Sequence, residues 1–390
     1  MRLPICGKDF FLWLLCALFL SCAPARADFD ASRTDNNSEK LKESSEDFRR
    51  YFLSFYTGIV SPQYKGQLNI EAPSEKDANG RPRWFDGRNG AESMDMITHA
   101  LVQQSRFGDI ERTVEKLRKT GAQMADGRML SIVFAGSAWQ AVRDTPTPEK
   151  TAREWRREIP NSSLAASIEA SLIFDAAWKA RGSGYADNVK PEQWEKFHLL
   201  MLQANKILGD AKSYRSVNPV WCQVKLETIF HLSKISFDET LKYCARKNPH
   251  HGMIFVDAMT FSMPKWGGTW RDVDDLARLA AAAARERDGD ANYARAYWNL
   301  LQRQGTPNKN IFQDTEVSWQ LMKKGFEDLV ARYPHSAWVV NAFAGFSCLA
   351  GDKSTFREIW PRIGAYLDHR AWPEKAQPEA CGKKLIGSPS

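Results

Sequence analysis

Apolar side chains recur every three or four positions through most of the chain beyond residue 90, which is the spacing of helices with one buried face. The longest such stripe consists of Trp194, Phe197, Met201, Ala204 and Leu208. Similar stripes occur in the segments that begin at Ile97, Ile110, Leu164, Val273, Trp319 and Phe356. Strand-like alternation is scarce, and only two short apolar runs, at 129–134 and 253–256, cannot be assigned by their period. The pattern predicts an all-α fold.

Three Gly-Asp pairs predict tight turns between these helices, namely Gly108-Asp109, Gly289-Asp290 and Gly351-Asp352. The last pair lies between two helical segments and resembles the turn of one tetratricopeptide-type unit. A strict period of about 34 residues is absent. The segment that ends at Pro249-His250 nevertheless aligns with the one that ends at Pro334-His335, which indicates degenerate duplication.

We therefore expect residues 47–370 to form one α-helical repeat-like domain, an irregular stack of helical hairpins of the tetratricopeptide-like α-solenoid kind. Each hairpin would bury its apolar stripe against its neighbours. A C-terminal tail at 371–390 would follow this domain.

The first 27 residues have the features of a secretory signal peptide. Arg2 and Lys8 precede an apolar run at 10–20, and Ala25-Arg26-Ala27 matches the pattern that signal peptidase cleaves. An apolar helix of this length rises only about 16 Å, so a membrane-spanning anchor is the weaker interpretation. A third interpretation is a bacterial lipoprotein anchored at Cys22. A polar leader at 28–46 follows, and we expect an exported protein of the periplasm or extracellular space without a transmembrane span.

Export gives the cysteines a structural meaning. Four of them, Cys222, Cys244, Cys348 and Cys381, lie beyond the predicted signal region, and an even number in an oxidising compartment favours two disulfides. Three connectivities are open, of which the local pairs Cys222–Cys244 and Cys348–Cys381 are favoured. A metal site is the rival interpretation, but no Cys-x-x-Cys or Cys-x-x-His spacing occurs.

Composition and charge narrow the class of protein. Of the 390 residues, 43% are hydrophobic and 12% aromatic, which excludes disordered and fibrous chains. The net charge of +7 is spread along the chain, whereas a nucleic-acid-binding protein would concentrate it in a stripe or tail. We therefore expect no nucleic-acid partner.

The middle and the end of the chain resemble a bacterial family known as domain of unknown function 4034. The resemblance covers roughly residues 160–367 and depends on the segments at 177–186, 219–221, 264–270, 341–344 and 348–352. The run Pro-Lys-Trp-Gly-Gly at 264–268 is its most unusual part. The resemblance implies an α-helical repeat-like fold and no particular activity.

The 264–270 segment is also the sharpest candidate for binding. Lys265 offers a cation, Trp266 and Trp270 offer stacking surfaces, and Gly267 and Gly268 allow close backbone approach. The favoured interpretation is structural and explains nearly every residue. Pro264 ends one helix, the glycines turn the chain, and Thr269 caps the next helix, with Asp272, Asp274 and Asp275 in its first turn.

Arg181 completes the candidate binding residues. The Arg181-Gly182-Ser183-Gly184 segment lacks the Lys-Ser/Thr pair of a phosphate-binding loop and follows a helix, so it predicts a helix end instead. The sequence contains no spacing that predicts a metal site, a cofactor or a catalytic group.

Two functions remain open from the sequence. The leading hypothesis is a non-catalytic exported helical scaffold that binds a protein or peptide partner through Trp, Tyr and Arg anchors. The alternative is a cell-envelope hydrolase that acts on peptidoglycan through a buried Glu. A groove lined by Trp266, Trp270 and neutral polar groups would favour binding, and a pocket that holds a buried carboxylate with a strongly raised pKa would favour catalysis.

Overall fold

A computed structural model describes residues 87–386 of the chain except 122, 125, 211–218, 306–309, 335 and 364–366. The predicted signal peptide at 1–27, the polar leader at 28–46 and the candidate lipid anchor Cys22 lie outside the described residues.

The described residues form sixteen α-helices and no strand, which confirms the predicted all-α class. The two ambiguous apolar runs lie in helices α7 (Leu130–Arg143) and α13 (Gly252–Phe261), and the nearest approach to a sheet is one isolated bridge between Gln123 and Met129. None of the helices in this part of the chain is long and apolar enough to cross a membrane.

The chain divides into two compact units, whose boundary lies between Phe237 and Asp238 in helix α12 (Lys234–Lys247). Unit 1 comprises the described residues up to Phe237, and unit 2 comprises those from Asp238 onward. A single array that runs through both units stays a prediction, and each unit is described by itself.

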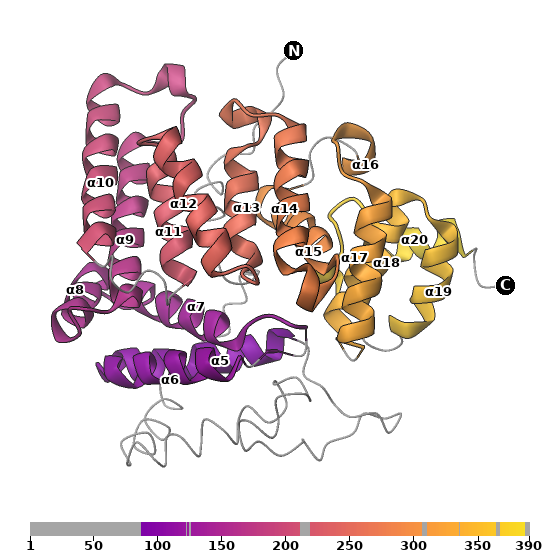
Figure 1. Ribbon diagram of the computed structural model, residues 1–390, viewed down its shortest axis with the longest axis horizontal. Coiled ribbons are helices and arrows are strands. Elements are labelled where there is room, and N and C mark those ends of the chain that lie inside the picture. Colours follow the sequence, from indigo (N-terminus) through magenta and orange to yellow (C-terminus); the bar gives the residue numbers. More distant parts are fainter. Residues whose placement is uncertain are drawn as a thin grey trace. The chain divides into compact units, whose positions relative to one another are not determined.

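Helix α9 is the central element of unit 1, because α8, α10 and α11 all pack against it (Figure 1). Every residue from Ser163 to Leu172 of α9 is buried. The α-helices of this unit besides α7 and the start of α12 are α5 (Gly87–Gln103), α6 (Phe107–Thr120), α8 (Pro148–Glu158), α9 (Ser163–Arg181), α10 (Pro191–Asp210) and α11 (Pro219–Phe230). A short 3₁₀ helix, η2 (Ala186–Asn188), lies between α9 and α10.

The predicted apolar stripes are the buried faces of α9 and α10. Phe197, Met201, Ala204 and Leu208 of α10 are all buried. On α9 the four-residue spacing holds from Leu164 to Leu172 but not to Ala176, which is exposed. An α-helix has 3.6 residues per turn, so a strict four-residue repeat drifts around the helix, and burial continues at Ala177 and Trp178 instead.

Unit 2 is built around one apolar cluster to which α13 to α20 contribute. After α13, its α-helices are α14 (Trp270–Asp288), α15 (Ala291–Gln304), α16 (Ile311–Asp314), α17 (Trp319–Arg332), α18 (Ala337–Ala350), α19 (Lys353–Ile363) and α20 (Pro378–Leu385). Two short 3₁₀ helices, η3 (Pro264–Trp266) and η4 (His369–Ala371), lie in its loops. Figure 1 shows α14 and α15 as neighbours, and α17 beside α18.

Two of the predicted Gly-Asp turns connect consecutive helices in unit 2. Gly289 and Gly351 adopt φ of 62° and 73°, a left-handed backbone that favours glycine. The aspartates that follow them form ion pairs with two consecutive lysines of α17. Lys324 Nζ lies 2.8 Å from Asp290 Oδ2, and Lys323 Nζ lies 3.3 Å from Asp352 Oδ2. Helix α17 therefore ties both turns together.

The first Gly-Asp pair has a different place from the one predicted. Gly108 and Asp109 lie in the first turn of α6, and the chain reverses before them, at Ser105, whose φ is 53°. Asp109 accepts hydrogen bonds from Arg106 and Arg112 there. A carboxylate is favoured in the first turn because it complements the helix dipole.

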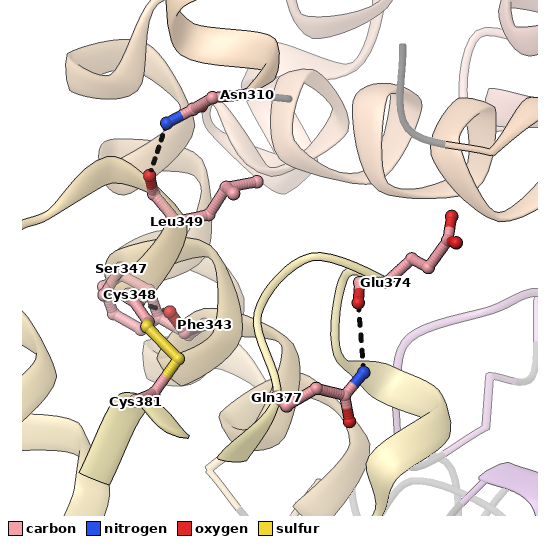
Figure 2. Close-up of a disulfide and its surroundings, with 8 residues drawn as sticks. All are labelled: Asn310, Phe343, Ser347, Cys348, Leu349, Glu374, Gln377 and Cys381. Carbon is pink, nitrogen blue, oxygen red and sulfur yellow. Dashed lines mark hydrogen bonds between the residues drawn. A yellow bond between two sulfur atoms is a disulfide. The ribbon is translucent and has the colours of Figure 1, made fainter. Parts of the chain in front are cut away.

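The chain after α19 packs against α18. Trp372 is buried and donates its indole N–H to Asn341 Oδ1 at 3.0 Å, and the same oxygen accepts the backbone N–H of Asp368 at 3.1 Å. Figure 2 shows the disulfide Cys348–Cys381, which joins α18 to α20 with a Cα–Cα distance of 5.8 Å. The predicted pairing of these cysteines is confirmed.

Candidate functional site

The 264–270 loop folds as its residue types require. Pro264 begins the 3₁₀ helix η3, and Gly267 follows at φ 88° and donates its N–H to Pro264 O at 3.0 Å. A Cβ on Gly268 would lie 2.1 Å from the carbonyl oxygen of Ser262, so only glycine fits this position. Gly267 thus supplies a backbone conformation, and Gly268 supplies the space for a close backbone contact.

Thr269 starts helix α14 with a complete capping box. Its hydroxyl accepts the backbone N–H of Asp272 at 3.1 Å, and Asp272 accepts the backbone N–H of Thr269 at 2.8 Å. Two N–H groups that would otherwise lack helical partners are satisfied in this way. The structural interpretation of the loop therefore accounts for Pro264, both glycines and Thr269, and leaves Lys265, Trp266 and Trp270 for other roles.

Of these three side chains, Trp270 lines an apolar hollow in unit 2 and Lys265 contacts one of its lining residues, whereas Trp266 is not part of the lining. The hollow is narrow, with a cavity volume of about 10 Å³, roughly the space of one water molecule, and Trp270 forms part of its lining. The other lining residues come from the loop before η3, from α15 and α16, and from the positions directly after these two helices: Met263, Tyr297, Leu300, Leu301, Gln304, Gly305, Ile311 and Thr315. Trp266 is half-buried and packs edge-on against Phe261.

Lys265 brings a cation to the edge of this hollow. Its ammonium group donates to Gln304 Oε1 at 2.5 Å, and Gln304 is itself a lining residue. Lys265 is an exposed residue, yet desolvation lowers its pKa. A cation next to apolar walls suits a partner that presents an apolar group together with an acidic one.

The hollow rests on a buried polar network that the sequence did not predict. Asp274 accepts hydrogen bonds from the hydroxyls of Tyr293 at 2.5 Å and Tyr297 at 3.0 Å, and from Arg278 Nε at 2.6 Å. Burial, together with Asp274, raises the pKa of both tyrosines, so they remain hydroxyl donors. The backbone N–H of Ser318 donates to Tyr293, and the network therefore connects α14, α15 and the start of α17.

Arg181, the remaining candidate, belongs to unit 1. Its guanidinium carbon lies 5.2 Å from the ring centre of Trp178 and 4.9 Å from that of Trp194. Its Nη1 donates to the carbonyls of Gly182 at 3.1 Å and Gly184 at 3.0 Å, which holds the end of α9 in place. Desolvation lowers the pKa of Arg181.

Two histidines lie around this arginine. His198 stacks on Trp194 with ring centres 5.8 Å apart, and His231 packs edge-on against Trp178 at 5.2 Å. Burial, with smaller contributions from the charges of Arg181 and His198, lowers the pKa of His231 to about 4. The environment therefore favours neutral groups or an added anion over further positive charge.

One carboxylate in unit 1 has the raised pKa that a hydrolase would need. Burial raises the pKa of Glu111, and hydrogen bonds from Ser162 and Trp155 oppose part of this effect. Both donors bind Glu111 Oε1, and Ser162 is also the N-cap of α9. Glu111 therefore joins α6, α8 and α9, which is a structural role. Within the described ranges, no three His, Cys, Asp or Glu side chains are grouped to hold a metal ion.

The structure brings Lys265, Trp266, Gly267, Gly268 and Trp270 together in one loop and places Arg181 in the other unit. The sequence missed the partners of the loop, above all Gln304 and Tyr297, because their spacing is that of an ordinary helix face. All four predicted cysteines are disulfide-bonded. Comparison of the chain with family models, characterised proteins and solved structures gives no match, so the resemblance to domain of unknown function 4034 stays a prediction.

Proposed function

We propose that the protein is an exported, non-catalytic helical scaffold that binds a protein or peptide partner through the 264–270 loop and the apolar hollow beside it. The observation that carries this proposal is the joint presence of Trp270 in the wall of the hollow and of Lys265 at its edge. Aromatic anchors with a flanking cation are common where a surface binds another protein.

Export is supported by the cysteines. Cys222, Cys244, Cys348 and Cys381 are all oxidised, and disulfides persist in the periplasm and outside the cell but are rare in the cytosol. The positively charged, apolar and small residues at 1–27 support the same compartment. The hairpins of unit 2 and their Gly-Asp turns support a tetratricopeptide-like origin, an architecture that often presents binding surfaces.

Photo-cross-linking tests the proposal. A benzoylphenylalanine at position 270 keeps an aromatic group in the hollow, and the same residue at position 279 is the matched control, because Leu279 is 47% exposed on the same helix and does not line the hollow. We expect cell-envelope extracts to yield one reproducible adduct at position 270 and none at position 279.

The adduct is then identified, and its binding to the purified full chain is measured. Equal cross-linking at both positions would contradict a specific surface. Turnover of peptidoglycan or of envelope peptides that a single Glu→Gln change abolishes would establish the hydrolase instead and overturn the scaffold.

A further inference from the structure

Arg181 has a geometry that sets it apart from a surface arginine. Two indole rings flank its guanidinium group, and two loop carbonyls occupy Nη1. No carboxylate of the described residues forms an ion pair with it. The loop and the rings together fix both the position and the plane of a permanent positive charge.

The hydrogen bonds leave a defined edge of this group unused. Nη1 has two N–H groups, and the carbonyls of Gly182 and Gly184 accept from it. Nε and Nη2 form the other edge, whose two parallel N–H groups match the two oxygens of a carboxylate. The half-buried ring of Trp194 lies 4.9 Å from the guanidinium carbon and adds an apolar surface next to the group.

A second arginine of unit 1 stacks on an indole and also binds a carboxylate. Arg143 also stacks on an indole, with its guanidinium carbon 4.5 Å from the ring centre of Trp139. Unlike Arg181, it has an internal carboxylate, since its Nη1 lies 2.7 Å from Asp175 Oδ2. Arg143 thus shows, within this unit, that an arginine stacked on an indole binds a carboxylate.

We propose that Arg181, Trp178 and Trp194 form a second binding site, which takes a carboxylate carried on an aromatic or apolar group, as at the C-terminus of a peptide. The guanidinium edge would bind the carboxylate, and Trp194 would contact the apolar group. This site is independent of the 264–270 loop, so either proposal can fail without the other.

The test is a titration of the full, oxidised chain with four probes, observed through the tryptophan indole resonances by NMR. N-acetyl-phenylalanine presents a carboxylate on an aromatic group. Its amide lacks the charge, and acetate lacks the aromatic group. Inorganic phosphate is an anion without a carboxylate. Trp178→Phe and Trp194→Phe assign the two resonances. We expect N-acetyl-phenylalanine to shift both, with at least tenfold weaker binding of the other three probes.

Two variants locate the effect. Arg181→Gln should weaken the binding of N-acetyl-phenylalanine at least tenfold. Arg181→Lys keeps the positive charge but loses the two parallel N–H donors, so its affinity should lie between those of Arg181→Gln and the wild type. Arg143→Gln is the matched control and should bind like the wild type. Equal binding of N-acetyl-phenylalanine and its amide to the wild type, a comparison that needs no variant, would overturn the proposal, as would unchanged shifts in Arg181→Gln.

Discussion

Some buried charged side chains of the described residues bind partners on another helix. Asp257 of α13 and Arg303 of α15 form an ion pair in which both side chains are almost inaccessible. Asp274 is similarly enclosed by Tyr293 and Tyr297. Because an unpaired buried charge costs roughly several kcal/mol, such contacts select which helix faces meet. At the residue scale, the polar network beneath the hollow therefore positions Tyr297, which lines it.

Glu111 gives a prediction with a defined pH dependence. Its pKa is raised in the folded state, so between about pH 4.5, where the unfolded residue titrates, and the higher folded value, the folded chain holds the extra proton. Stability from this group therefore falls as pH rises through that window. We expect Glu111→Gln, which keeps an acceptor for Trp155 and Ser162, to be more stable than the wild type at pH 7.

Urea unfolding at pH 7 and pH 4 measures this difference, which should shrink at the lower pH as the wild-type carboxyl becomes protonated. A less stable variant at pH 7 would show that Glu111 works as a charged acceptor and would contradict the assignment.

At the element scale, periodicity and turn chemistry predicted the helices well. The apolar stripes that begin at Leu164, Trp194 and Val273 mark helices α9, α10 and α14, because burial of one face is a local property of the sequence. The role of Asp274 could not be predicted from periodicity or turn chemistry. The sequence assigned it to the helix dipole, whereas its carboxylate is buried against two tyrosines from another helix. Such a partner cannot be inferred from local spacing.

The two glycines of the 264–270 loop make distinguishable predictions. Gly267→Ala introduces a side chain at φ 88° with open space around it, so we expect a loss of about 1 kcal/mol from backbone strain. Gly268→Ala drives a Cβ into the Ser262 carbonyl, and we expect a loss of about 3 kcal/mol. Chemical denaturation of both variants gives the comparison, and equal losses would contradict the assigned roles.

At the scale of the whole molecule, the candidate site could be predicted only in part. The 264–270 loop was found because Pro, Gly and Trp are unusual together. The hollow beside this loop could not be predicted, because Leu300, Gln304 and Ile311 come from α15 and α16 and have the spacing of ordinary helical residues. The same holds for Arg181, whose two indole neighbours lie on α9 and α10. Tertiary packing, which one sequence does not encode locally, assembles both sites.

The disulfides predict how the oxidised protein behaves as a whole. We expect thiol labelling of the denatured, unreduced exported chain to leave Cys222, Cys244, Cys348 and Cys381 unmodified, and four reactive thiols would refute their oxidation. Replacing Cys348 and Cys381 together by Ala opens a loop of 33 residues and should lower the stability of unit 2 by about 3 kcal/mol, measured by denaturation against the oxidised wild type.

We propose that the protein binds its partner through the hollow beside the 264–270 loop. The most direct measurement of this claim is the affinity of the partner cross-linked at position 270 for two alanine variants of the same helix, Trp270→Ala and Leu279→Ala. An anchor in a binding surface contributes roughly 2 kcal/mol or more, so Trp270→Ala should weaken binding about thirtyfold while Leu279→Ala leaves it unchanged. Equal affinities of both variants and the wild type would contradict the claim.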